Sequence, residues 1–306
     1  MAPTIKVALR LRLEILLARW FCGDRRSGRI RFLPRGRIAK LGAFSHEVEA
    51  MEFVRQNTTI RVPKVYKAYG MHDGRQHFVM ERLPGQPASR VVRDWTPEQT
   101  ETFGRDLADV IRQLRALQPP PLPTGKVIGS ARGGVNRDAR LSSCPFGPFD
   151  SVTAFHTYLR FGRPLEHWKD REAVVKIHGR PEDTYAIKFA HADLEPQNIM
   201  VDDDAHIVRV IDWEFAGWYP EFWEYTKAFW SEMRPHWNNF YRAFEVQPDI
   251  QRYPDELACE VAIWMRMHSP FKYYDPPWQP GDEGTCRSTS GDNDDDDDND
   301  TRRQSV

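Results

Sequence analysis

Three polar residues in the second half of this chain have the types and spacing needed to handle a phosphate and a metal ion. Asp193 and Asn198 lie in the stretch HADLEPQN, and Asp212 follows in IDWEF. Amide and carboxylate oxygens suit Mg²⁺, which keeps several waters and takes its other ligands from phosphates. A further carboxylate nearby can orient or deprotonate a hydroxyl nucleophile. Together these residue types favour kinase-type phosphoryl transfer, in which the protein positions groups and neutralises charge.

The residues between Asn198 and Asp212 predict the element that brings them together. Two short apolar runs, 199–201 and 207–211, flank a polar segment at 202–205, which is typical of a β-hairpin with a polar turn. Because a hairpin brings its two ends together, Asn198 and Asp212 should lie side by side, with Asp193 on the loop that leads in. A turn cap, a loop stabiliser and a strand end are the alternative roles, but they do not explain the joint spacing.

This stretch resembles the catalytic and metal-binding loops of the aminoglycoside phosphotransferase family, the small-molecule branch of the protein-kinase-like superfamily. The usual pattern there is H-G-D-x-x-x-x-N followed by I-D-W/F, a specific signature because it sets several polar residues at defined spacing. The resemblance implies that Asp193 is the catalytic base and that Asn198 and Asp212 hold Mg²⁺. The stretch GSARGGVNRD resembles a loop common in fungal relatives, which indicates a fungal-type member.

The resemblance also implies the fold, the cofactors and the substrate class. The fold is expected to be α+β and protein-kinase-like, with a small, shortened β-rich N-lobe and a larger, mainly helical C-lobe. ATP is expected to donate its γ-phosphate to a hydroxyl group of a small molecule, with Mg²⁺ as the metal. The N-lobe should comprise residues 1–82 and the C-lobe residues 83–280. Residues 281–306 form an acidic tail that is too polar to fold.

The N-lobe should supply a lysine that contacts the nucleotide. Lys40 lies on the second of two predicted strands, 29–33 and 37–41, where kinase-like folds carry the lysine for the α and β phosphates. The helix predicted from SHEVEAMEFVRQNT places Glu47 on a face shared with apolar residues. A carboxylate on such a face needs a partner, and Lys40 is the obvious candidate. Glu49 is the alternative partner.

Two further strands, 64–69 and 77–80, precede a break at a Pro-Gly pair. In the resembled family this break is the hinge between the lobes, where backbone groups bind the adenine. Glu81 and Leu83 are therefore assigned to ATP binding by resemblance. An ordinary connection from a strand to a helix is the alternative interpretation.

The rest of the C-lobe is predicted mainly from helical patterns. Thr96, followed by proline and then by Gln99, predicts a capped helix start, and apolar residues then repeat at helical spacing. A long loop is expected at 125–150, and further helices at 151–159 and 166–176. The aromatic and acidic stretch at 213–237 either lines a site for a cationic or sugar-like acceptor or packs the helical lobe.

Composition limits the class of protein. The 306 residues are 40% apolar, which is ample for a core, and no run reaches the roughly 18 apolar residues that a membrane span needs. Outside the tail, 40 Lys and Arg face 35 Asp and Glu. This dispersed surplus suits an anionic ligand but predicts no nucleic-acid binding. A cytoplasmic monomer with four reduced cysteines is expected. The basic segment at 5–21 is either a helix on the N-lobe or a targeting segment.

Two functional classes remain open. The first is the ATP- and Mg²⁺-dependent phosphotransferase described above. The second is a catalytically weak or inactive kinase-like protein that binds a nucleotide or a partner. Two features favour the second class: no G-x-G-x-x-G precedes Lys40, and Glu195 follows Asp193 by two residues, where its charge would repel a phosphoryl group.

Overall fold

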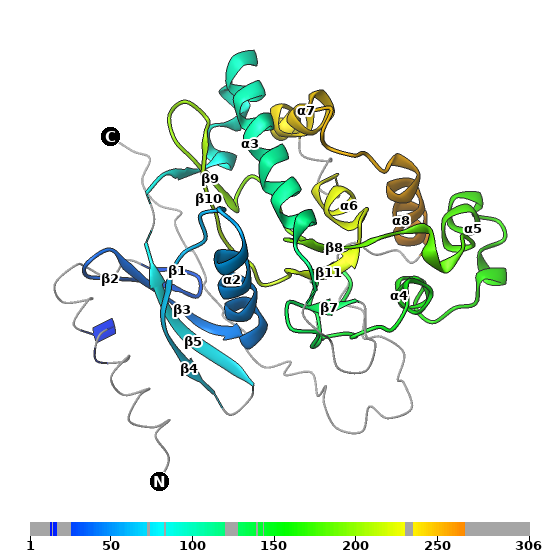
Figure 1. Cartoon of the computed structure of the whole chain (residues 1–306), viewed down its shortest axis with the longest axis horizontal. Coiled ribbons are helices and arrows are strands. Elements are labelled where there is room, and N and C mark those ends of the chain that lie inside the picture. Colours follow the sequence, from blue (N-terminus) through cyan, green and yellow to red (C-terminus); the bar gives the residue numbers. More distant parts are fainter. Residues whose placement is uncertain are drawn as a thin grey trace, which may run out of the picture.

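The structure is a computed structural model that describes residues 13, 15–16, 26–71, 74–82, 84–119, 128–138, 140–142, 144–229 and 235–266. Among the described residues, a five-stranded sheet and helix α2 form the N-lobe, and a mainly helical C-lobe lies beside it (Figure 1). The strands are β1 Arg26–Ser27, β2 Ile30–Leu33, β3 Arg37–Phe44, β4 Val65–Gly70, β5 Arg75–Glu81, β6 Gln86–Pro87, β7 Gly129–Ser130, β8 Ile187–Ala190, β9 Ile199–Val201, β10 Ile207–Val210 and β11 Gly217–Pro220. The α-helices are α2 Ser45–Asn57, α3 Pro97–Ala116, α4 Val152–Leu159, α5 Glu172–His178, α6 Trp223–Phe229, α7 Asn238–Val246 and α8 Pro254–Arg266.

The N-lobe sheet is antiparallel, with strand order β1-β2-β3-β5-β4. Its first two hairpins turn at Gly28 and Gly36, whose φ angles of 51° and 63° lie in the region that glycine adopts without a steric cost. Helix α2 buries an apolar stripe that includes Met51 and Val54, and it shares a core with Phe78 of β5. The four strands predicted for this lobe are confirmed, with boundaries that differ by a few residues.

Helix α3 begins with the predicted capping box. Thr96 Oγ1 accepts a hydrogen bond from Gln99 N at 3.2 Å, and Gln99 Oε1 accepts one from Thr96 N at 3.0 Å. These bonds satisfy backbone donors that have no partner inside the helix. The apolar stripe of α3, which includes Phe103 and Leu107, is fully buried. The helix thereby packs against α7 and against β8, the strand that leads into the candidate site.

The predicted hairpin is confirmed, because β9 and β10 pair antiparallel around the polar turn. In Figure 1 these two strands lie between the N-lobe sheet and α3. Strand β6, just after the predicted hinge, pairs with β9 through Gln86 and Val201. A third sheet has the order β7-β11-β8. The hairpin is therefore joined by backbone hydrogen bonds to the chain segment that connects the lobes.

Two predicted segments differ from the structure. The loop expected at 125–150 contains the short strand β7, because Gly129 and Ser130 pair with β11. The helix expected at 166–176 is divided into the 3-10 turn Leu165–Trp168 and α5. Arg171 lies between them with φ −119° and ψ 85°, which is not helical, so the helical hydrogen bonding is interrupted there.

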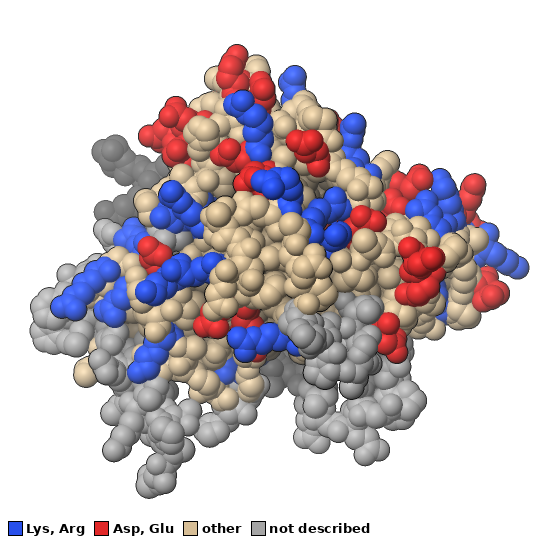
Figure 2. All heavy atoms as spheres, in the orientation of Figure 1, with Lys and Arg blue, Asp and Glu red and all other residues tan. Residues whose placement is uncertain are grey.

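Other expectations concern the termini, the cysteines and the surface. The acidic tail and nearly all of the N-terminal segment lie outside the described residues. Cys259 is a free thiol, as predicted, and it is buried. Cys144 is disulfide-bonded, so the prediction of a reduced thiol is wrong there. Among the described helices, none is both long and apolar enough to cross a membrane. Figure 2 shows Lys and Arg interspersed with Asp and Glu over the face it presents.

We predict that Thr96→Ala lowers the free energy of unfolding by about 1 kcal/mol, the usual effect of losing a helix cap. Urea denaturation measures this change. Thr102→Ala in the same helix is the control, because Thr102 Oγ1 only accepts a bond from the Arg105 side chain at 3.3 Å. Equal losses in the two variants would show that the cap is not the cause.

Candidate active site

A cavity of about 570 Å³ is lined by residues of the N-lobe sheet, α2, the predicted hinge and the end of the β9–β10 hairpin. This volume is typical of small-ligand sites. Its apolar lining residues include Ile30, Phe32, Ile38, Met80, Met200 and Ile211. Its charged lining residues include Arg29, Lys40, Glu47, Glu81 and Asp212. The cavity thus combines apolar surface with a cluster of charges.

Lys40 is the centre of that cluster. Its Nζ donates to Glu47 Oε1 at 2.8 Å and to Asp212 Oδ1 at 2.7 Å. Burial lowers the pKa of Lys40, but the surrounding carboxylates raise it overall above its ordinary value. Burial raises the pKa of Glu47 to about 7, against the lowering effect of Lys40. The predicted contact between Lys40 and Glu47 is confirmed, and the structure assigns Lys40 to Glu47 rather than to Glu49.

The loop between β8 and β9 holds Asp193 and Asn198 together. Asn198 Nδ2 donates to Asp193 Oδ2 at 2.6 Å and to Asp193 O at 3.0 Å, which fixes the orientation of the carboxylate. Burial raises the pKa of Asp193 to about 7. The Lys227 ammonium opposes this rise, and the charges of Glu195 and Asp212 add to it. The loop therefore presents an oriented carboxylate that titrates near neutral pH.

Glu195 is engaged on its own loop. Its backbone N–H donates to Asp193 O at 2.8 Å, and its buried carboxylate accepts a hydrogen bond from Gln197 Nε2. The side chain is thereby held by a neighbour two residues along the loop. Its negative charge nevertheless contributes to the raised pKa of Asp193.

The hairpin places Asn198 beside Asp212, as predicted. Ile211 N donates to Asn198 O at 2.9 Å, one residue before Asp212. Asp212 itself has a φ of 64°, an uncommon backbone conformation for a residue with a side chain. His191 Nε2 donates to Ile211 O at 3.0 Å, and burial lowers the pKa of His191 to about 4, so the imidazole is neutral at pH 7. Ile211 therefore ties the Asp193 loop to the Asp212 loop.

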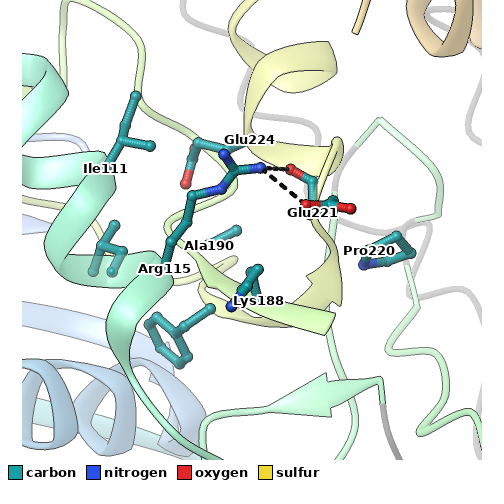
Figure 3. A pocket seen from close by; sticks show the side chains of 9 residues that line it. Ile111, Arg115, Lys188, Ala190, Pro220, Glu221 and Glu224 are labelled. Carbon is teal, nitrogen blue, oxygen red and sulfur yellow. Dashed lines mark hydrogen bonds and ion pairs between the residues drawn. The ribbon is translucent and has the colours of Figure 1, made fainter. Parts of the chain in front are cut away.

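Glu224, in α6, holds the beginning of the Asp193 loop through hydrogen bonds to its backbone. Its carboxylate accepts hydrogen bonds from His191 N at 2.6 Å and from Ala192 N at 3.2 Å. Ala192 has a φ of 60°, which is unfavourable for a residue with a Cβ, and these bonds help to hold it there. Burial raises the pKa of Glu224 to about 7. Glu224 also lines a water-sized cavity of about 10 Å³. Figure 3 shows the side chains around it and the contact of Arg115 with Glu221.

Sequence reasoning missed this role of Glu224, because it grouped the residue with a possible acceptor lining. The aromatic residues around it pack the C-lobe instead: Trp213, Trp218, Phe222 and Trp223 are at most 1% exposed. The packing interpretation of this stretch is therefore confirmed for these four residues. The only signal for Glu224 was an acid among large apolar residues, which did not identify its partner.

Glu214 and Arg29 were also missed. Glu214 Oε2 lies 2.9 Å from Arg29 Nη2 and 4.0 Å from Lys40 Nζ. Glu47, Asp212 and Glu214 each offer a carboxylate oxygen within 4.8 Å of the others, a set of hard donors that fits a divalent cation. The signal for Glu214 was its place two residues after Asp212 in IDWEF.

Two buried ion pairs anchor the loop 136–142 in the C-lobe. Lys227 Nζ lies 2.9 Å from Asp138 Oδ1, and Arg140 Nη1 lies 3.1 Å from Glu260 Oε2. The side chains of all four residues are at most 5% exposed. Removing one partner of such a pair leaves an uncompensated buried charge. The pair with Asp138 therefore fixes Lys227 where its charge acts on Asp193.

The predicted hinge is described only in part. Glu81 lines the cavity at the end of β5, and its N–H donates to Lys64 O at 2.9 Å. Arg82 N donates to Gly36 O at 2.8 Å. Contacts from these two residues to a ligand must therefore use groups other than their N–H. Leu83 lies outside the described residues, so its predicted role stays a prediction, as does that of Glu81.

The two lobes together have a protein-kinase-like fold, and residues of both lobes line the cavity. Solved aminoglycoside phosphotransferases share this fold. A thermostable mutant of aminoglycoside phosphotransferase APH(4)-Ia, in a ternary complex with AMP-PNP and hygromycin B, has a TM-score of 0.54 at 16% identity. The match covers 84% of this chain and 88% of that chain. The GDP and kanamycin complex of APH(2")-IIia has a TM-score of 0.50 at 10% identity and covers 85% and 89%. These likenesses concern the fold alone.

The family follows from the sequence match. The model of the phosphotransferase enzyme family (APH) matches residues 18–258 of this chain. No curated protein matches the chain. The chain belongs to the phosphotransferase enzyme family.

We predict that Glu224→Gln changes how stability depends on pH. Because burial raises the folded-state pKa of Glu224 from 4.5 to about 7, its stabilising contribution is full below about pH 4.5 and is lost as the pH rises through 7. Glutamine does not titrate. The stability of the wild type relative to the variant should therefore fall between about pH 5 and pH 8, by at most on the order of 3 kcal/mol. Urea denaturation across this range measures the difference.

Glu221→Gln is the matched control, because Glu221 is half-buried nearby and contacts Arg115 rather than the Asp193 loop. Its stability difference from the wild type should not follow the trend of Glu224→Gln. A pH-independent difference for Glu224→Gln would contradict the buried, titrating carboxylate.

Proposed function

We propose that this protein is an ATP- and Mg²⁺-dependent phosphotransferase that moves the γ-phosphate to a hydroxyl group of a small molecule. The observation that carries the proposal is Lys40, which is buried and held by both Glu47 and Asp212 at the cavity wall. A lysine placed in this way can contact phosphates in a ligand that occupies the cavity. The bound AMP-PNP of the APH(4)-Ia complex supports an adenine nucleotide as the donor.

The proposed roles follow from the contacts of each residue. Lys40 contacts the α and β phosphates, and Glu47 holds its ammonium in position. Asp193 accepts the proton of the acceptor hydroxyl as the oxygen attacks the γ-phosphorus and the bond to the leaving ADP oxygen breaks. Asn198 keeps the Asp193 carboxylate oriented through its bond to Oδ2. The apolar part of the cavity takes the adenine, next to the proposed contacts of Glu81 and Leu83.

Asn198 and Asp212 would hold Mg²⁺ in this proposal, with Glu214 as a third oxygen donor close to Asp212. The carboxylates of Glu47, Asp212 and Glu214 support a divalent cation at this place, because each offers an oxygen within 4.8 Å of the others. Asn198 is assigned to the ion from the sequence pattern. When bound, Mg²⁺ neutralises charge on the phosphates. The contact between Lys40 and Asp212 places the proposed metal ligand beside the proposed phosphate contact.

Other parts of the proposal rest on the sequence. We propose an N-lobe at 1–82, a C-lobe at 83–280 and an acidic tail at 281–306. We also propose that the protein is a fungal-type member of the family, that it is a cytoplasmic monomer, and that its acceptor is a small molecule. The hygromycin B and kanamycin of the neighbouring structures are hydroxyl-bearing aminoglycosides, which supports testing this class of acceptor first.

The second candidate function is nucleotide binding without efficient transfer. The observation that favours it is the short connection between β1 and β2, where Ser27 pairs with Ile30 and only two residues form the turn. Such a turn cannot enclose phosphates with backbone N–H groups as a glycine-rich loop does. We favour the enzyme, because the oriented Asp193 and the contacts of Lys40 are both present.

We predict that ATP with Mg²⁺ raises the melting temperature of the wild type, because a ligand that binds only the folded state stabilises it by mass action. A ligand at 100 times its Kd contributes about 2.7 kcal/mol. Asp212→Asn should lose most of this stabilisation. Asp203→Asn, on the exposed turn of the same hairpin, should keep it. A wild type whose melting temperature does not respond would remove the main support for the phosphotransferase.

We predict that the rate of phosphate transfer rises with pH through about 7, because burial raises the pKa of Asp193 to about 7 and only the ionised carboxylate accepts a proton. ADP release with a panel of hydroxylated amines, sugars and aminoglycosides measures the rate. Asp193→Asn should lower it by roughly 10²- to 10⁴-fold. If the wild type binds ATP but turns over no faster than this variant, the binding-only function is correct.

A further inference from the structure

The turn between β1 and β2 brings the Arg29 side chain to the cavity and contains no run of glycines. Strands β1 and β2 are joined by Gly28 and Arg29, and Gly28 turns the chain with a φ of 51°. Arg29 then lines the same cavity as Lys40 and Asp212. The cationic group on this side of the cavity is therefore a guanidinium on a tight hairpin.

Arg29 and Lys40 converge on one carboxylate oxygen. Glu214 Oε2 lies 2.9 Å from Arg29 Nη2 and 4.0 Å from Lys40 Nζ. A second nitrogen of the guanidinium, Nη1, donates to Gly42 O at 3.3 Å, which holds the side chain against β3. Arginine and lysine also bind phosphate oxygens through charge-assisted hydrogen bonds, so this pair of cations is chemically suited to a phosphate.

The Arg29 side chain is accessible to a ligand, although its neighbours in the cluster are mostly buried. The Arg29 side chain is 46% exposed, whereas those of Glu214 and Lys40 are 18% and 6% exposed. Burial lowers the pKa of Arg29, but Glu214, Glu47 and Asp212 together raise it above its ordinary value. Arg29 therefore stays charged, and its partner is a carboxylate that also belongs to the group of oxygens suited to a cation.

We propose that Arg29 binds the β and γ phosphates of the nucleotide, and so provides with a side chain the contacts that a glycine-rich loop makes with backbone N–H groups. The ligand class is a nucleoside di- or triphosphate. Guanidinium groups bind phosphate oxygens in pairs, which suits a short turn that cannot wrap around the phosphates. This inference rests on the proposed function, because it assumes that a nucleotide occupies the cavity.

The test compares nucleotides that differ only in their phosphates. Isothermal titration calorimetry of the full chain with Mg²⁺ measures the affinities of ATP, ADP and adenosine for the wild type and for Arg29→Ala. We expect Arg29→Ala to weaken ATP and ADP by roughly 10- to 100-fold, the effect of one or two charge-assisted hydrogen bonds. Its affinity for adenosine should stay within about twofold of the wild type. Arg29→Lys should recover part of the loss, because it keeps the charge but not the paired geometry.

Arg31→Ala is the matched control on the same hairpin. Arg31 Nη1 donates to Gly28 O at 2.6 Å and does not line the cavity, so it supports the same turn without facing the ligand. This variant should bind ATP like the wild type. An equal loss of ATP affinity in Arg31→Ala would show that the turn, not the Arg29 guanidinium, is responsible, and would overturn the proposal.

The remaining outcomes separate this inference from the proposed function. If the wild type binds ATP and Arg29→Ala binds it equally well, the inference is overturned while the phosphotransferase stands. If Arg29→Ala loses adenosine as strongly as ATP, the arginine is structural and the inference is again overturned. If the wild type binds neither ATP nor adenosine, the proposed function and the role of Arg29 are both overturned.

Discussion

The buried ammonium of Lys40 is the interaction on which the arrangement of the site depends. It contacts both Glu47 of α2 and Asp212, and Asp212 is 172 residues from Lys40 along the chain. Because the ammonium and Glu47 are almost fully shielded from water, a charge left without its partner there would be costly. The N-lobe sheet, α2 and the β9–β10 hairpin must therefore adopt positions that keep all three groups in contact.

Burial also makes it unfavourable for other carboxyl groups at the site to ionise. Burial raises the pKa values of Asp193 and Glu224 to about 7, so the ionisation of these two carboxyl groups destabilises the fold. Asp193 nevertheless has to be ionised in order to accept a proton. Stability and the proposed activity thus change in opposite directions as the pH rises through 7.

Two residues of the site have an uncommon backbone conformation. Ala192 and Asp212 both have positive φ angles, an arrangement that surrounding hydrogen bonds must maintain. Glu224 accepts a hydrogen bond from Ala192 N. Ile211, the residue before Asp212, is held by hydrogen bonds to His191 and to Asn198. The carboxylates of Asp193 and Asp212 are thereby positioned by backbone that would relax if the support from α6 were lost.

The sequence by itself determined the features that depend on local spacing. The β9–β10 hairpin follows from two apolar runs around a polar turn, and hairpin closure then places Asn198 beside Asp212. The cap of α3 at Thr96 and the pairing of Lys40 with Glu47, only seven residues apart, are local in the same way. Hydrogen-bond geometry and residue periodicity act over such distances, so the sequence predicts the contacts directly.

Only the tertiary structure decided the contacts between distant segments. Arg29 contacts Glu214, which is 185 residues further along the chain. Glu224 accepts a hydrogen bond from the backbone N–H of His191, which is 33 residues earlier in the chain. Neither pairing has a periodic signal, because each depends on how the lobes and α6 pack against the Asp193 loop. Charged residues of both signs are common along the chain, and the packing of the core selects which of them meet.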